Sequence, residues 1–186
     1  MQKIIYTSPE KIEWDAQSAF KVTNYYTDNE QHMVFCYLKQ YVQDGRLKLC
    51  TFCFDSEASG KNDIHLCFNL NPAKSERCID IEFGIDGIGS VCCIDGDVTP
   101  MDCDGISFRS YKSNDQQGFY WCGEITLSQQ FTDRYFDTIL DEAGIILLNM
   151  YRVFADSSDY ACLFPDSNND ILARADSMQE FVILKY

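Results

Sequence analysis

Large apolar side chains recur at every second position in many segments of this chain. In residues 78–85, which read CIDIEFGI, the apolar set consists of Ile79, Ile81, Phe83 and Ile85. Successive side chains of a strand point to opposite faces, so this period of two predicts a half-buried strand. The DG pair at residues 86–87 supplies the positive φ of a tight turn, and residues 90–97 return as the partner strand. The acidic residues of this hairpin, including Asp80 and Glu82, are expected on its solvated face and in its turns.

The same alternation predicts further strands along the chain. They span residues 32–42, 47–56, 63–70, 118–127, 145–155 and 178–186. The first two are joined by QDGR, which is a second turn signal of the Asp-Gly kind. Strands that recur with turn residues between them favour two packed β-sheets over an α/β fold. We therefore predict an all-β fold, a two-sheet antiparallel β-sandwich with one or two short helices.

One segment has a helical period instead. Residues 128–143 carry an apolar set at helical spacing, made up of Phe131, Tyr135, Phe136, Ile139 and Leu140. Ser128 is a favourable residue to cap the start of this helix, and Gly144 to end it. The chain shows no internal repeat, low-complexity tract or linker, so residues 1–186 are expected to form a single domain.

The charge of the chain limits its partners. The 15 Lys and Arg residues against 29 Asp and Glu residues give a formal net charge of -14. Such a chain repels phosphate backbones and anionic lipid surfaces, so neither nucleic acid nor a membrane is expected as a partner. The first fourteen residues lack an apolar core of signal-peptide length, which leads us to expect a cytoplasmic protein.

Ten cysteines are expected to be free thiols. Cys50 and Cys53 form a CxxC pattern, but they lie in an alternating run, where residues three apart point to opposite faces. The two histidines, His32 and His65, do not complete a cysteine and histidine cluster with zinc spacing. The cytosol keeps thiols reduced, and a free cysteine packs as a small hydrophobic residue.

Catalytic and metal motifs are weak. The sequence has no nucleophile elbow, phosphate-binding loop or HExxH motif. The acidic run DGDVTPMDCDG, residues 95–105, carries Pro100 where an EF-hand loop needs glycine, which favours a solvated acidic loop. We therefore expect no catalytic residue, metal site or cofactor, with structural calcium outside the EF-hand pattern as the alternative.

Four segments, in order, resemble motifs of the family 9 carbohydrate-binding modules and their wider relatives. They are IEWDAQSAF (12–20), DIEFGIDGIG (80–89), YWCGEITLSQQF (120–131) and LLNMYRVFADSSDYACLFP (147–165). The end of the chain, SMQEFVILKY, is similar to the closing strand of that family. The resemblance spans nearly the whole chain and rests on the order and spacing of short motifs.

The resemblance implies a β-sandwich of jelly-roll-like topology that binds sugar without catalysis. Sugar rings stack their apolar C–H faces on aromatic rings, and their hydroxyl groups need planar hydrogen-bonding groups. Phe164 or Cys162 stands where the family carries a tryptophan before the late proline, and the loss of that indole predicts weak binding of a neutral saccharide. The carbohydrate-binding residues that the resemblance implies are Glu82, Glu124, Asn149, Tyr151, Arg152 and Phe164.

Structural roles compete with these assignments. Arg152 is equally compatible with an ion pair inside the protein. Glu82 and Glu124 are compatible with solvated or hydrogen-bonded strand carboxylates. Trp121 shares a strand face with apolar residues, which is typical of the core, and Trp14 is compatible with a structural role.

Three functions remain open at this point. An aromatic-lined concavity that contains Arg152 would favour a carbohydrate-binding module. A flat, apolar sheet face would favour a structural or protein-interaction β-sandwich that has lost the sugar site. Two carboxylates in one cleft, roughly 5 to 10 Å apart, would favour a two-carboxylate glycoside hydrolase.

Overall fold

The computed structural model describes most of the chain, and residues 11, 33–34, 56–61, 117, 142–143, 155–157, 167–169 and the termini 1–2 and 186 lie outside the description. The predicted strands and helix that extend into those positions are compared only over their described parts. The strands are β1 (Ile4–Ser8), β2 (Phe20–Lys21), β3 (Asn24–Tyr26), β4 (Cys36–Gln43), β5 (Arg46–Asp55), β6 (Asp63–Asn69), β7 (Cys78–Gly84), β8 (Gly87–Asp95), β9 (Asp97–Pro100), β10 (Ile106–Asn114), β11 (Phe119–Leu127), β12 (Gly144–Val153), β13 (Tyr160–Cys162) and β14 (Gln179–Lys185). The helix is α1 (Gln129–Phe136), and the 3₁₀ turns are η1 (Trp14–Ala16), η2 (Glu30–His32) and η3 (Ala173–Ser177).

The predicted strands are confirmed as β4 to β8, β11, β12 and β14. The β4–β5 hairpin turns at Asp44 and Gly45, which have φ values of 50° and 68°. Two successive residues with positive φ match the twist of a tight hairpin, which explains the Asp-Gly pair at this point. The β7–β8 hairpin also forms where the sequence predicts it. Sequence reasoning did not predict β1, β2, β3, β9, β10 or β13.

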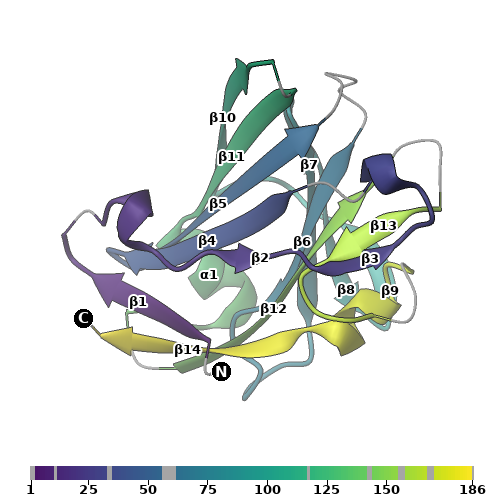
Figure 1. Ribbon diagram of the computed structural model, residues 1–186. Coiled ribbons are helices and arrows are strands. Elements are labelled where there is room, and N and C mark those ends of the chain that lie inside the picture. The colour runs from purple at the N-terminus through teal and green to yellow at the C-terminus, as the bar shows by residue number, and fades with distance from the viewer. Residues whose placement is uncertain are drawn as a thin grey trace.

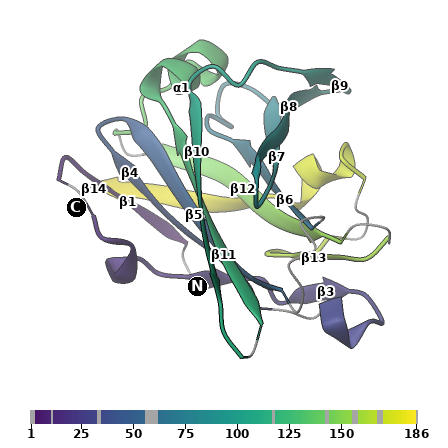
Figure 2. The same ribbon diagram turned by 90° about the horizontal axis from the view of Figure 1, so that it is seen from above.

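The described strands are joined into one mixed sheet that curls on itself. Its main order is β10-β11-β5-β4-β1-β14-β12-β6-β7-β8-β9, and β2, β3 and β13 attach to this path. Figure 1 shows the β4–β5–β11–β10 half on one side and the β12–β6–β7–β8 half on the other. Seen from above in Figure 2, the two halves face each other, with β1 and β14 running beneath.

The wholly antiparallel, two-sheet arrangement is not confirmed. Strand β1 pairs in parallel with β14 on one edge and with β4 on the other, and so links the two halves into one sheet. The alternation of side chains shows that a segment is a strand, but it is the same for both directions of pairing. The alternation of side chains therefore could not predict that β1 pairs in parallel with its neighbours.

The core fills the space between the two halves. Phe83 of β7 contacts Phe108 of β10 and Trp121 of β11, with ring centroids 5.4 and 6.2 Å apart. At Gly123 an added Cβ would lie 2.9 Å from the Phe83 ring and 3.0 Å from the Phe108 ring. A glycine here lets these rings approach the backbone of β11. Trp121 is buried, as the sequence predicts.

Helix α1 begins as predicted and ends early. The Ser128 side chain accepts a hydrogen bond from the Phe131 backbone N–H, which is a regular N-cap. The helix stops at Asp137, which adopts the left-handed conformation with φ 47°. The prediction that Gly144 ends the helix is wrong, because Gly144 begins β12. Aspartate tolerates the left-handed region, so a glycine was not required for the stop.

Asp80 is the exception to the predicted faces of the β7–β8 hairpin. It is not solvated but only 1% exposed. Its Oδ2 lies 2.8 Å from His65 Nδ1 and accepts a hydrogen bond from Arg174 Nη1 at 3.2 Å. The outer face of β6 and β7 is covered here by η3, so Asp80 belongs to a buried polar cluster.

Within the described residues, no helix is long and apolar enough to cross a membrane. The described residues, the acidic run 95–105 among them, contain no group of three or more histidine, cysteine, aspartate or glutamate side chains that could hold a metal ion.

All ten cysteines are free thiols in the structure, and seven are buried. Two cross-strand pairs are close: Cys36 Sγ lies 3.2 Å from Cys53 Sγ, and Cys50 Sγ lies 3.1 Å from Cys122 Sγ. Cys36 and Cys53 are directly opposite each other on β4 and β5. The hydrogen bond with Cys50 lowers the pKa of Cys122, and the one with Cys53 lowers the pKa of Cys36, so each pair contains one thiol whose reactive thiolate is favoured.

Thiol titration of the denatured protein under non-reducing conditions is expected to find close to all ten thiols. Mild oxidation of the folded protein should then close Cys50–Cys122 before Cys36–Cys53, because Cys122 is only half-buried whereas the other pair is buried. Peptide mapping by mass spectrometry identifies the bridge formed. A thiol count near zero before oxidation would contradict the reduced state, and preferential closure of Cys36–Cys53 would contradict the order.

Candidate functional site

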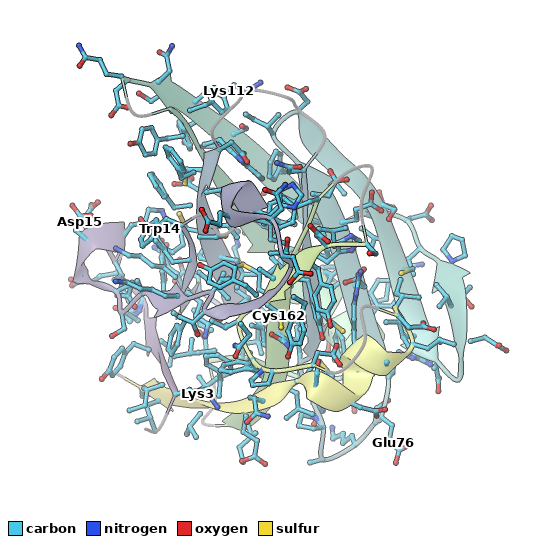
Figure 3. The ribbon with its side chains drawn as sticks, turned by 45° about the vertical axis from the view of Figure 1, so that its right-hand side comes forward. Lys3, Trp14, Asp15, Glu76, Lys112 and Cys162 are labelled. Atoms are coloured by element: carbon cyan, nitrogen blue, oxygen red, sulfur yellow. The ribbon has the colours of Figure 1, made fainter. Side chains whose placement is uncertain are left out.

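A cavity on the outer face of β4, β5, β10 and β11 is the candidate site. Its volume is about 550 Å³, within the usual range for small-ligand sites. It opens beside η1, and Figure 3 shows Trp14 and Asp15 of this turn at one side of the molecule. The described lining residues are Ile12, Glu13, Trp14, Tyr41, Gln43, Arg46, Lys48, Ser107, Arg109, Tyr111, Glu124, Ile125 and Thr126.

The period of two in the strands places the polar lining on one face. The inward residues of β11, such as Trp121 and Ile125, are buried in the core, so the alternating residues Cys122, Glu124 and Thr126 point outward. Two rows of neighbours cross the sheet at the cavity. They are Ser107–Thr126–Lys48–Tyr41 and Arg109–Glu124–Cys50–Lys39.

Trp14 forms one wall of the cavity and is held on three sides. Its ring meets Tyr41 edge to face, with centroids 4.8 Å apart and planes at 61°. Its Nε1 donates to Glu124 Oε1 at 2.8 Å, and its backbone oxygen accepts from Lys39 Nζ at 2.9 Å. The side chain is half-buried. The tryptophan is therefore fixed in position while part of the indole stays open to the cavity.

Glu124 lies at the centre of the hydrogen bonding. Besides the bond from Trp14, its Oε2 accepts from the Tyr111 hydroxyl at 3.5 Å, which is at the long limit for such a bond. Neutral donors thus orient the carboxylate. Tyr111 is 51% exposed, so the Glu124 end of the cavity remains open to solvent.

Three cations surround the other side of the cavity. Lys48 Nζ donates to Thr126 Oγ1 at 3.1 Å. Burial lowers the pKa of Lys48, and the positive charges of Arg46 and Arg109 lower it further, against the opposing effect of Glu124. The two arginines are exposed and therefore able to reorient toward a ligand.

Aromatic side chains continue the same outer face beyond Tyr111. Tyr37 and Phe52 stack with centroids 5.2 Å apart, and Tyr120 lies 5.8 Å from Phe52. Phe35 lies edge-on to Tyr37 at 5.4 Å and is 44% exposed. The cavity therefore lies at one end of an aromatic surface.

A larger cavity, of about 870 Å³, is less suited to a sugar. It lies among α1, residues 70–74 and the start of β12. Its described lining is mainly aliphatic and contains no aromatic ring. It offers no surface on which a sugar ring could stack.

The structure places Asn149 and Tyr151 of β12 in the interior, under η3. Neither side chain has any exposed surface. Asn149 Nδ2 donates to Ser177 Oγ at 3.0 Å, and the Tyr151 hydroxyl donates to Asp166 Oδ2 at 2.7 Å. Arg174 lies over the Tyr151 ring at 5.0 Å. The polar groups that sequence reasoning offers to a sugar are engaged within the protein.

Arg152 points into the core on the opposite face of β12. It is 1% exposed, forms an ion pair with Asp55, and donates to the Phe54 carbonyl oxygen at 3.0 Å. Trp121 Nε1 also donates to Asp55, at 3.0 Å. Arg152 therefore forms an ion pair inside the protein, which was the alternative to ligand binding. It does not line the aromatic cavity beside Trp14.

Glu82 and Phe164 lie elsewhere. Glu82 accepts from the Ser90 hydroxyl at 2.7 Å on the outer face of β7, in the other half of the sheet. The Phe164 ring lies 5.9 Å from Phe181, with Lys3 Nζ 4.4 Å from its centroid. The six predicted residues are thus not gathered in one place, and Glu124 is the one that lines the cavity.

Sequence reasoning missed most of the cavity. A structural role was left open for Trp14, and no role was predicted for Tyr41, Arg46, Lys48 or Arg109. The outward positions of β5 and β11 were readable from their alternation. The sequence did not show that β10 pairs with β11 beside these positions, because β10 itself was not predicted.

Comparison with known proteins bears on the fold. No protein-family model matches the chain, and no curated protein matches it in sequence. A crystal structure of a proposed carbohydrate-binding protein from Bacteroides uniformis has a TM-score of 0.71 at 7% identity, over 91% of this chain and 88% of that one. A family 9 carbohydrate-binding module from Caldicellulosiruptor kristjanssonii, in complex with glucose, has a TM-score of 0.66 at 12% identity, over 98% of this chain and 95% of the module.

The chain has a family 9-like fold. This confirms the resemblance that the four sequence segments indicated. Coverage of 98% means that the likeness extends over nearly the whole chain. At 12% identity the likeness concerns the fold, so the candidate site of this chain rests on its own residues.

Proposed function

We propose that this chain is a non-catalytic carbohydrate-binding module whose ligand binds beside Trp14, Tyr41 and Glu124. The observation that carries the proposal is this aromatic-lined cavity, which contains an oriented carboxylate, in a family 9-like fold. Both similar structures are described as carbohydrate-binding, one of them with glucose bound. The function remains the one that sequence reasoning favoured, but at a different place on the molecule.

The cavity provides the two kinds of contact that a saccharide needs. The open part of the Trp14 indole and the Tyr111 ring offer apolar surface for C–H faces of a pyranose. Glu124 and Ser107 provide acceptors, while Gln43 and Lys48 provide donors, for ring hydroxyl groups. Few aromatic rings line the cavity, so we expect weak binding, with a dissociation constant roughly in the submillimolar to millimolar range.

Trp14→Ala is expected to weaken saccharide binding about tenfold to a hundredfold. An aromatic ring that stacks on a nucleic-acid base contributes on the order of 1 to 3 kcal/mol, and we expect a comparable loss for a sugar face. Glu124→Gln should also weaken binding, since the charged acceptor is lost while the side-chain shape is kept. A glycan array identifies a ligand, and isothermal titration calorimetry measures the affinities.

Glu82→Gln is the matched control for Glu124→Gln, because both carboxylates stand at outward strand positions of the two halves. It should leave the affinity unchanged. Weaker binding in Glu82→Gln with normal binding in Glu124→Gln would move the site to the β7 face. Absence of any saccharide ligand would support the interaction-module alternative instead.

A further inference from the structure

We propose that the saccharide bound in this cavity carries an anionic group, a carboxylate or a sulfate, and that Arg46, Lys48 and Arg109 recognise it. The proposal rests on the proposed function and specifies the ligand class for the same site. It changes the expectation, drawn from the sequence, that the saccharide is neutral.

The first observation is the concentration of positive charge at this cavity. The whole chain has 15 basic residues against 29 acidic ones. In the described lining of the cavity the balance is reversed, with three cations against the two carboxylates Glu13 and Glu124. Arg46 and Lys48 stand two residues apart on β5, so both lie on its outer face, and Arg109 projects from the outer face of β10.

The second observation is that these cations lack carboxylate partners. Within the described chain, none of the three forms an ion pair, although Lys74, Lys112 and Arg152 all do. Arg109 stands directly across from Glu124 in the β10–β11 register, yet Glu124 is hydrogen-bonded to Trp14 and Tyr111. Glu124 and Asp44 therefore act on Lys48 through space, but neither forms an ion pair with it.

The third observation is that the cations oppose one another. Partial burial disfavours the charge on Lys48, and Arg46 and Arg109 disfavour it further, whereas Glu124 and Asp44 favour it. Repulsion between like charges that line one cavity lowers the stability of the folded state, and a nearby opposite charge reduces that repulsion. An anionic group in the cavity would relieve this repulsion and would contact all three side chains.

The chemistry of the cluster suits a carboxylate or sulfate attached to a sugar ring. A guanidinium presents a planar fork of donors that binds carboxylate and sulfate oxygens in pairs, and an ammonium acts as a compact point charge. Trp14 and Glu124 on the opposite wall remain available for the ring and its hydroxyl groups. Uronic acid and sulfated saccharides combine both features in one ligand.

The test compares paired oligosaccharides by calorimetry. Tri-galacturonate is measured alongside its methyl ester, and a sulfated galactan oligosaccharide alongside its desulfated form. We expect the charged member of at least one pair to bind about tenfold tighter or more, a gap that narrows as ionic strength rises. The pair that shows the gap distinguishes a carboxylate from a sulfate.

Variants locate the effect. Arg46→Gln and Arg109→Gln should each lower the affinity for the charged probe about fivefold to tenfold and leave the neutral probe unchanged. Arg134→Gln on α1 is the matched control, because it removes one exposed arginine outside the cavity. Circular dichroism and thermal melting verify that each variant is folded.

Each other outcome overturns the inference in a distinguishable way. Equal affinities for charged and neutral probes, with both lost in Trp14→Ala, would leave the proposed function intact and reject the anionic ligand. Equal binding of inorganic sulfate and the sulfated probe would identify a simple anion site without saccharide recognition. Failure of all four probes, together with a blank glycan array, would reject the proposed function and this inference together.

Discussion

Arg152→Ala is expected to lower the free energy of unfolding by about 3 to 5 kcal/mol, which is typical when one partner of a buried ion pair is removed. Arg152 is 1% exposed, and its guanidinium serves both Asp55 and the Phe54 carbonyl oxygen. Without it the buried carboxylate of Asp55 keeps hydrogen bonds from Trp121 and Asn62 but loses its counter-charge. Those two remaining bonds place the expected loss toward the lower end of the range.

Urea denaturation measures this loss, and Arg77→Ala is the matched control. The Arg77 side chain is 41% exposed and lies 3.7 Å from Asp95, so its removal should cost at most about 1 kcal/mol. The double variant Arg152→Ala with Asp55→Asn should recover part of the loss, because the unpaired charge is then gone. Equal effects of Arg152→Ala and Arg77→Ala would show that the buried pair contributes little.

The same variant separates stability from ligand binding. Below its unfolding temperature, Arg152→Ala should bind saccharide as the parent protein does, because Arg152 lies in the core and the candidate cavity is on the outer face of the other half. Lost binding in a fully folded variant would return Arg152 to the ligand site that the family resemblance implied.

The strands were predictable where one face is buried. Strand β7 has a large apolar residue at each inward position, namely Ile79, Ile81 and Phe83, and β5 and β11 have apolar residues at most of theirs. This pattern requires only local information. Strand β10 was not predicted because its sequence, ISFRSYKSN, shows little apolar alternation. Serine occupies inward position 110, and most of the remaining residues of the strand are polar. The parallel pairing of β1 depends on both ends of the chain meeting, which no local pattern encodes.

The predicted sugar-binding residues are dispersed over the molecule, and part of the reason is contained in the sequence itself. Residues 151 and 152 are neighbours on one strand, so their side chains must point to opposite faces. Tyr151 and Arg152 therefore could not have joined in one site. What the sequence could not show is that η3 folds over the outer face of β12 and buries Asn149 and Tyr151.

The candidate cavity was harder to predict because its residues are far apart in the chain. Trp14 and Glu124 are hydrogen-bonded across 110 positions. The indole N–H of Trp14 has a partner only because β11 lies next to β5 and η1 lies over β4. A tryptophan beside a short apolar run is compatible with either a core or a surface role until that arrangement is known.

Asp80→Ala should destabilise the fold by about 3 to 5 kcal/mol, the range for breaking a buried ion pair. Asp80 is 1% exposed on β7, and its Oδ2 joins His65 of β6 to Arg174 of η3. The substitution leaves the buried guanidinium of Arg174 without this carboxylate, and η3 loses a connection to the sheet. Amide hydrogen exchange should therefore rise first in η3, ahead of global unfolding.

Glu82→Ala provides the contrast on the same strand. Glu82 stands two residues beyond Asp80 on the same outward face, but it is half-exposed and bonded to the Ser90 hydroxyl. Its removal should cost about 1 kcal/mol or less, the usual value for one hydrogen bond. Asp80→Asn should fall between the two, since the amide oxygen still accepts while the charge is lost. If Asp80→Ala were as mild as Glu82→Ala, with normal exchange in η3, Asp80 would belong to the solvated face that the alternation of β7 first suggested.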